Sequence, residues 1–203
     1  MSRVVLASGN AGKLREFADM LADAGIELVP QSDFAISQPP ETAVTFIENA
    51  LAKARHAARE TGLAAIADDS GLEVDALGGA PGVHSARFAG AHGDDRENNA
   101  RLLGELDGVP AERRTARYRA VLIHLRSADD PAPIVAEGTW EGRIAAGPRG
   151  DGGFGYDPLF ELPDGRTAAE LPTEEKNLLS HRGKALAELR RRLDALHDRA
   201  GRG

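Results

Sequence analysis

The spacing of apolar residues in the first third of the chain switches between short runs, which predict strands, and repeats of three and four residues, which predict helices. Polar or glycine-rich segments separate the two kinds of pattern. Strands and helices that alternate in this way indicate an α/β fold. The predicted elements are strands over residues 3–7, Ile26–Val29 and Leu63–Ala67, helices over residues 12–24 and 43–60, and a Pro-rich loop over Gln31–Glu41.

The helix predicted over residues 43–60 has one apolar stripe, and its opposite face is expected to be solvated. The polar face carries Asn49, Lys53, His56 and Glu60. These residues would matter for function only where that face lines a cleft. The apolar stripe consists of Val44, Ile47, Leu51, Ala54 and Ala58.

The second half of the chain predicts a hairpin and a final helix. Two long segments rich in Val, Ile, Tyr and Trp are separated by a turn-like linker, which is typical of two paired strands. Ser180 is a good N-cap for the last helix, whose leucine stripe is expected to face the core. The segments are strands over Thr115–Arg126 and Ile134–Ile144, a glycine-rich loop over Gly147–Gly155, and a stripe of Leu186, Leu189, Leu193 and Leu196. The sheet is therefore expected to be mixed.

Composition narrows the class of protein. The 203 residues predict one domain, residues 1–198, with a loose tail over 199–203. The chain has no cysteine, which excludes disulfides, thiol nucleophiles and Cys-ligated zinc and fits a cytoplasmic protein. No segment approaches the ~20 apolar residues of a membrane span, and no leader pattern opens the chain. A net charge of -7 disfavours binding to nucleic acid polymers but allows a small anionic ligand.

The first predicted strand runs into a glycine turn with a lysine just beyond it, Ser8-Gly9-Asn10-Ala11-Gly12-Lys13. Backbone N–H groups at the start of a helix have no helical partner, and the helix dipole favours an anion there. The common P-loop needs glycine where this chain has Ala7, and Ser or Thr where it has Leu14. The segment is thus either a phosphate-binding turn of another kind or a plain strand–helix connection.

Adjacent carboxylates, Asp68 and Asp69, stand where the third predicted strand ends. Ligands collect at such strand ends in open α/β sheets, and carboxylate oxygens suit Mg²⁺. Consecutive side chains of a strand point to opposite faces, so both would face one ion only where the strand has broken. One of the two is therefore expected to act while the other shapes the loop. Glu41 offers a further carboxylate, and the alternative is a simple Asp-Ser-Gly turn.

Two further segments carry unusual combinations of residues. Gly152–Pro158 places two aromatic residues among glycines, which suits stacking on a base, although a tight turn with one hydrophobic anchor is the alternative. Residues 174–182 end in basic side chains at the start of the last helix, where they oppose the helix dipole. Such a misfit is frequent at functional sites, although a structural role is an equal alternative.

Taken in order, these motifs closely resemble the inosine/xanthosine triphosphate pyrophosphatase family, whose members remove deaminated purine nucleotides. The resemblance covers residues 3 to 196 and includes every motif. Its segments are Ser8-Gly9-Asn10 with Lys13, Thr45 to Ala50 with Lys53, Asp68 to Leu72, Gly78 to Gly82, Gly153 to Pro158, Glu175-Lys176, and Ser180-His181-Arg182.

The resemblance implies a mixed α/β fold with an elongated central sheet, flanking helices and two lobes around a substrate cleft. It also implies a homodimer that needs Mg²⁺ and cuts a purine nucleoside triphosphate between the α and β phosphates. The implied triphosphate binders are Ser8, Gly9, Asn10, Ala11, Gly12, Lys13 and Lys53. Asp69 resembles the general base and metal ligand, assisted by Asp68 and Glu41.

For the nucleoside, the resemblance implies that Ser70 contacts the substrate and that Phe154 stacks on the base. Gly155, Tyr156 and Asp157 lie beside Phe154 in the motif, and Lys176, His181 and Arg182 resemble the base-reading side. A pyrimidine triphosphate pyrophosphatase is a competing hypothesis, but its Ser-x-Ser-x-x-Arg opening turn is absent here. A nucleotide-sensing module is another, and it would have no use for the Asp68-Asp69 pair.

Overall fold

The computed structural model describes residues 2–21, 26–90 and 94–200. The chain divides into two compact units. Unit 1 comprises residues 1–69, 120–138 and 182–203, and unit 2 comprises residues 70–119 and 139–181. Three strands, β3 (Ala64–Val74), β4 (Thr115–Leu125) and β5 (Ile134–Ile144), begin in one unit and end in the other.

The sheet has six strands in the hydrogen-bonded order β2-β1-β3-β4-β5-β6, which confirms the predicted mixed α/β fold. The strand β1 (Ser2–Ala7) pairs in parallel with β2 (Ile26–Pro30) and with β3. At the other edge β6 (Phe160–Glu161) pairs antiparallel with β5. The predicted hairpin of β4 and β5 is confirmed, because the two strands are neighbours joined by a short turn. The lobes and the cleft implied by the resemblance stay a prediction.

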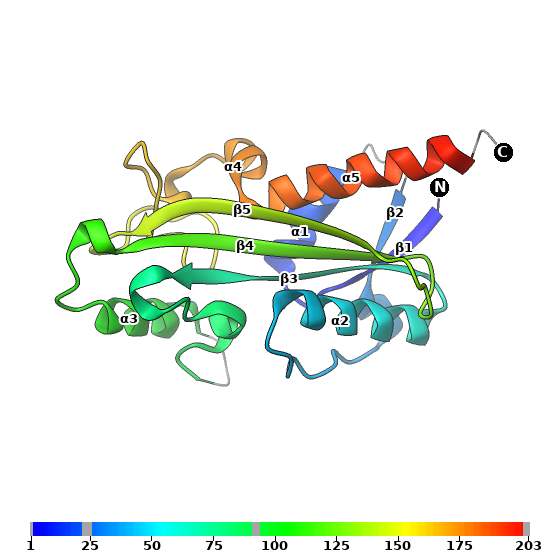
Figure 1. The fold of residues 1–203 in the computed structure, drawn as a ribbon, viewed down its shortest axis with the longest axis horizontal. Helices are drawn as coiled ribbons and strands as arrows, with labels where there is room; N and C mark the ends of the chain where they lie inside the picture. Colours follow the sequence, from blue (N-terminus) through cyan, green and yellow to red (C-terminus); the bar gives the residue numbers. More distant parts are fainter. Residues whose placement is uncertain (1, 22–25, 91–93, 201–203) are drawn as a thin grey trace. The chain divides into compact units, whose positions relative to one another are not determined.

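In unit 1, helices cover both faces of the strands (Figure 1). One face carries α1 (Ala11–Leu21) and α5 (His181–Ala200), whose side chains share a core with alternate residues of β1 and β3. Phe17, Leu186 and Leu189 belong to this core with Val4 and Ile66. The other face carries α2 (Phe46–Thr61). The end predicted for the first helix, with Gly25, lies outside the described residues.

The predicted orientation of α2 was wrong only in part, because Ala54 and Ala58 of the predicted stripe are buried and Glu60 is exposed, as expected. Val44 and Ile47, expected in the core, are 83% and 41% exposed, whereas Asn49 and Lys53, expected in solvent, are buried. The buried side of the helix consists mainly of alanines, which are joined by one large apolar residue, Phe46, and by the two polar residues. The buried residues of the helix are Phe46, Asn49, Ala50, Lys53, Ala54, Ala57 and Ala58.

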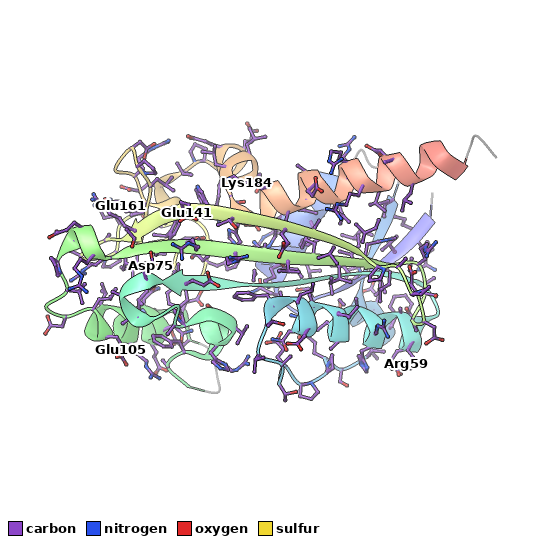
Figure 2. The ribbon with its side chains drawn as sticks, in the orientation of Figure 1. Arg59, Asp75, Glu105, Glu141, Glu161 and Lys184 are labelled. Carbon is purple, nitrogen blue, oxygen red and sulfur yellow. The ribbon has the colours of Figure 1, made fainter. Side chains whose placement is uncertain are left out.

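Unit 2 contains α3 (Asp95–Glu105) and α4 (Thr173–Leu179), neither of which was predicted. Its core joins Leu102 of α3 to Trp140, Tyr156 and Phe160. Arg117 of β4 is paired with Asp75 and Glu141, which are labelled in Figure 2. The Gly78–Gly82 segment is a shaped loop as predicted, since Gly78, Gly79 and Gly82 all have positive φ.

The last helix starts where Ser180 predicted and buries Leu186, Leu189 and Leu193. Leu196, expected in the same stripe, is 42% exposed. The helix extends to Ala200, so the predicted tail is shorter than residues 199–203, and its remainder lies outside the described residues. Among the described residues no helix is long and apolar enough to cross a membrane.

Candidate active site

The opening glycine turn of unit 1 is closed by its own side chains. Ser8 Oγ accepts a hydrogen bond from Asn10 N at 3.2 Å. Asn10 Oδ1 accepts from Gly12 N at 2.8 Å and from Lys13 N at 3.1 Å. The N–H groups that were expected to meet a phosphate therefore already have an acceptor. A phosphate at this helix start would have to replace the side-chain oxygen Asn10 Oδ1 as the acceptor.

Lys13 belongs to a group of four charges, here called the Lys13 cluster, which also includes Glu16, Asp68 and Arg182. Lys13 Nζ lies 2.5 Å from Asp68 Oδ2, and Arg182 Nε lies 3.6 Å from the same oxygen. Arg182 Nη1 also pairs with Glu16. Burial of Asp68 opposes its ionisation, but the two nearby cations hold the pKa of its carboxyl well below the usual range. Arg182, predicted on the base-reading side, thus lies beside the Lys13–Asp68 pair.

A second group, here called the Lys53 cluster, joins one lysine to two carboxylates. Lys53 Nζ donates to Glu41 Oε1 and to Asp69 Oδ1, both at 2.8 Å. Burial lowers and the two acids raise the pKa of Lys53, with a net rise. Burial and the neighbouring Glu41 raise the pKa of Asp69, and Lys53 offsets this only in part. Because two anions share one cation, the cluster carries a net negative charge when all three groups are ionised.

Asn49 holds the segment that leads to Glu41. Its Oδ1 accepts from Ala43 N at 3.1 Å, and its Nδ2 donates to Ala43 O at 3.4 Å. Thr45 caps α2 by accepting from Glu48 N. The burial of Asn49, unexpected from the amphipathic pattern, thus has a local reason, since both ends of its amide bind the backbone of the segment before the helix.

The strand β3 does not break at the two aspartates but continues to Val74. Asp68 and Asp69 therefore point to opposite faces, as their contacts with the Lys13 and Lys53 clusters show. Of the three predicted metal ligands, the structure brings together Glu41 and Asp69 and places Asp68 on the other face. Asp69 Oδ2 is buried and accepts no hydrogen bond.

The described residues contain no group of three or more His, Cys, Asp or Glu side chains that could hold a metal. Two carboxylates with one buried oxygen still to be coordinated nevertheless fit Mg²⁺, which commonly binds one or two carboxylates and completes its shell with water and phosphate oxygens. Glu41 and Asp69 are therefore the residues that could hold this ion.

In unit 2, Asp157 joins three elements. Its Oδ2 accepts from Phe154 N at 2.9 Å and from Lys176 Nζ at 2.7 Å, and its Oδ1 accepts from Tyr118 OH at 3.3 Å. Lys176 Nζ lies 5.0 Å from the centre of the Phe154 ring. Asp157 thus brings the Phe154 ring and the Lys176 ammonium together, and all three residues were predicted as site residues. At Gly153, with φ of 72°, a Cβ would come within 2.1 Å of Asp157 Oδ2.

His181 is buried and stacks on Tyr118, with ring centres 4.6 Å apart and planes at 10°. Tyr118 in turn packs against Phe160 of the core. Tyr156 is also buried, and its hydroxyl donates to Ser85 O at 2.8 Å. This makes Tyr156 an anchor for the loop rather than a side chain that meets a base. Ser70 is half-buried within β3.

Sequence reasoning missed three kinds of site residue. Glu16 is one polar residue among several on an amphipathic helix. Tyr118 lies in a strand whose buried residues are mostly apolar, and it belongs to the core cluster itself. Asp95 and Asn99 hold Gly155 from α3, and the only sequence signal for that helix was the capping pattern of Asp94 before Asp95 and Glu97.

The comparisons with known proteins agree along nearly the whole chain. The model of the Ham1 family matches residues 4–192. A dITP/XTP pyrophosphatase of Thioalkalivibrio sulfidiphilus is 57% identical over 192 residues, which is 94% of this chain and 98% of that relative. One from Shigella flexneri is 56% identical over 199 residues, 98% of this chain and all of that protein.

Solved structures support the same relationship. A HAM1 protein from Coxiella burnetii has a TM-score of 0.89 and 47% identity, covering 96% of this chain and 100% of that one. A nucleoside-triphosphatase, or dITP/XTP pyrophosphatase, from Mycobacterium abscessus has a TM-score of 0.75 and 48% identity, covering 92% and 98%. This chain belongs to the Ham1 family.

Proposed function

We propose that this protein hydrolyses deaminated purine nucleoside triphosphates (ITP, dITP and XTP) to the monophosphate and pyrophosphate, and so removes them from the nucleotide pool. The observation that carries the proposal is full-length similarity, at 56–57% identity, to relatives that are dITP/XTP pyrophosphatases. The two charged clusters of unit 1 supply groups that suit phosphate. Phe154, Asp157 and Lys176 of unit 2, here called the aromatic cluster, supply groups that suit a base.

Lys13 and Lys53 bind the triphosphate in this proposal, with the turn from Ser8 to Gly12 shaping the approach. Displacement at phosphorus depends on neutralising charge and on in-line placement more than on covalent help. Glu41 and Asp69 would hold Mg²⁺, which when bound neutralises phosphate charge. Asp68 orients Lys13 through its ion pair.

Asp69 is the proposed general base. A carboxylate can orient a water and take its proton as that water attacks the α-phosphorus. Lys53 fixes the position of the Asp69 carboxylate through Oδ1. No covalent nucleophile is needed, which agrees with the absence of cysteine from the chain.

The base is proposed to stack on Phe154 and to be read by donors. Hypoxanthine and xanthine present a hydrogen-bond acceptor at C6, whereas adenine presents an amino donor. The Lys176 ammonium, held beside the Phe154 ring, is a donor only. A donor facing the adenine amino group leaves both unpaired, and sites built on such bonds reject a wrong partner by roughly 10⁴-fold or more. His181 and Arg182 stay predicted base-readers.

A panel of nucleoside triphosphates, scored for pyrophosphate release with and without Mg²⁺, tests the proposal. ITP, dITP and XTP should release pyrophosphate far faster than ATP, and only with the metal present. Hydrolysis of ATP as fast as ITP would remove the substrate assignment. Binding without release would instead favour a nucleotide-sensing module.

We also propose that the protein acts as a homodimer in the cytoplasm. Two-fold pairs are the commonest soluble homo-oligomers. Light scattering should report twice the mass of the 21.5 kDa chain. A mass near that of one chain would contradict the dimer.

A further inference from the structure

Two side chains at the start of α3 hold both polar groups of one residue in the aromatic loop, residues 152–158. Asp95 Oδ2 accepts from Gly155 N at 2.6 Å, and Asn99 Nδ2 donates to Gly155 O at 2.9 Å. Asp95 and Asn99 are one helical turn apart, so they present a matched acceptor and donor on the same face. All three residues lie within unit 2, to which α3 belongs (Figure 1).

The residue that they hold is the immediate neighbour of Phe154. The backbone of Phe154 itself is also held, because Phe154 N donates to Asp157 Oδ2. Two residues after Phe154, the Tyr156 hydroxyl is bound to Ser85 O. The backbone around Phe154 is thus anchored by contacts from both directions along the chain. Gly155 has φ of 62°, a left-handed conformation that glycine adopts without steric cost.

The helix α3 has other residues for its N-cap and its packing. Its N-cap is Asp94, whose carboxylate accepts from Arg96 N and Glu97 N. Its packing comes from buried Leu102, and Asn98 binds the segment before it through Ala86 O and Ala89 N. The hydrogen bonds of Asp95 and Asn99 go to the aromatic loop, although Asp95 also lies in the first turn of the helix, where an acidic side chain suits the dipole.

We propose that Asp95 and Asn99 are positioning residues that fix the Phe154 ring for stacking on the purine base. The inference rests on the proposed function, because it assigns Phe154 to the base. Fixing the ring in advance reduces the ordering that binding would otherwise require. The effect belongs to base binding and not to bond cleavage, since stacking acts equally before and during the reaction.

The test is steady-state kinetics of pyrophosphate release from ITP with Asp95→Ala, Asn99→Ala and the double variant. KM should rise about 2- to 5-fold in the double variant with kcat nearly unchanged, a part of what a lost base–aromatic stack costs. Asp95→Asn keeps an oxygen acceptor for Gly155 N and should restore KM to near the wild-type value.

Asp94→Ala is the matched control. It removes a carboxylate one residue away and takes the cap from α3, so it should lower the melting temperature without raising KM. A rise in KM with Asp94→Ala that equals the rise with Asp95→Ala would overturn the proposal, because a general loosening of α3 would then explain both.

Phe154→Ala supplies the decisive background. If Asp95 and Asn99 act through the Phe154 ring, adding Asp95→Ala and Asn99→Ala to Phe154→Ala should raise KM no further. Fully additive effects, or an unchanged KM in the Asp95 and Asn99 variants, would overturn the inference. Failure of the wild-type protein to release pyrophosphate from ITP, dITP and XTP would instead remove the proposed function, so the two failures are distinct.

Discussion

The charged clusters of unit 1 and the aromatic cluster of unit 2 hold their functional groups in different ways. In unit 1, Lys13, Lys53 and Arg182 each touch a carboxylate of the protein itself. In unit 2, the Phe154 loop is held mostly through its backbone, by side chains of Asp157, Asp95 and Asn99. In unit 1 the cations are paired with carboxylates of the protein, whereas in unit 2 the hydrogen bonds fix the position of the Phe154 ring.

This difference has a consequence for the substrate. A triphosphate must compete with Asp68, Asp69 and Glu41 for the lysines, or bring a cation that those carboxylates can hold. On the Phe154 ring a purine base would compete with no carboxylate, and the charged group over that ring is the Lys176 ammonium. Changes at the carboxylates and lysines of the two charged clusters should therefore alter turnover, whereas changes around Phe154 should alter affinity for the base.

Asp69→Asn should have the largest effect on turnover. We expect kcat to fall by roughly 10² to 10⁴, the usual range for a lost general base, while the fold and nucleotide binding persist. Stopped-flow or steady-state measurements of pyrophosphate release give kcat, and a melting curve checks the fold. Near-full turnover in the variant would remove Asp69 from this role.

Asp68→Asn is the matched control for that experiment. It makes the same chemical change at the neighbouring residue, but on the opposite face of β3, where the carboxylate pairs with Lys13. Its kcat should fall less than that of Asp69→Asn. Equal losses would mean that the two faces of the strand do not differ in function.

Lys13→Ala should come next. A triphosphate is negatively charged both before and during displacement, so both KM and kcat/KM should worsen. A hydrogen bond to a charged group is worth about 1.5–3 kcal/mol, so kcat/KM should drop about 10- to 100-fold. Lys184→Ala, at an exposed lysine of α5 (Figure 2), should change neither. Unchanged kinetics in Lys13→Ala would show that the opening turn is not a phosphate site.

Phe154→Ala should raise KM for ITP and ATP together, by about 10-fold, because stacking holds either purine. The ratio of kcat/KM for ITP over ATP should stay constant in this variant and fall in Arg182→Ala if that residue reads the base. The opposite pattern, a ratio lost with Phe154→Ala and kept with Arg182→Ala, would reverse these assignments.

The sequence predicted the fold well where the pattern of apolar residues was strong. The strands β1, β2, β4 and β5 and the start of α5 appear within a residue or two of their predicted bounds. The end of β3 was misplaced because Asp68-Asp69-Ser70-Gly71 has the composition of a turn, yet both aspartates have cationic partners that let the strand continue. The amphipathic pattern misled for α2, where a buried lysine is stabilised by two acids that are distant in the sequence.

The candidate site was predictable by motif but not by contact. Periodicity and spacing alone do not connect Lys53 with Asp69, because the two residues lie sixteen positions apart in the chain. Only the family resemblance indicates that both belong to the site. The alternation of strand side chains indicated that Asp68 and Asp69 would face one ion only if the strand broke, and β3 continues past both residues. Nothing in the sequence indicates the Tyr118–His181 stack, because it depends on the register of β4 against the start of α5.

Of the changes considered, Asp130→Ala should have the smallest effect on activity. It serves as the structural reference for the carboxylates of the candidate site. Asp130 is a buried, paired carboxylate like those of the Lys13 and Lys53 clusters, but it closes the β4–β5 turn. It accepts from Arg126 N at 3.0 Å, from Arg126 Nε at 2.9 Å and from Ala132 N at 3.0 Å. Losing these bonds should cost about 1.5–3 kcal/mol of unfolding free energy, with kcat and KM unchanged.

The pH dependence of that loss gives the prediction its sign. The hydrogen bonds from Arg126 hold the pKa of Asp130 below its ordinary value of 3.8. The contribution of the ionised carboxylate to stability is therefore complete at neutral pH and is lost as the pH falls below 3.8 toward the folded-state pKa. The difference in unfolding free energy between wild type and Asp130→Ala, measured by urea titration, should shrink over that range. A difference independent of pH, or a loss of turnover at pH 7, would mean that burial and pairing of a carboxylate do not by themselves distinguish a structural aspartate from Asp69.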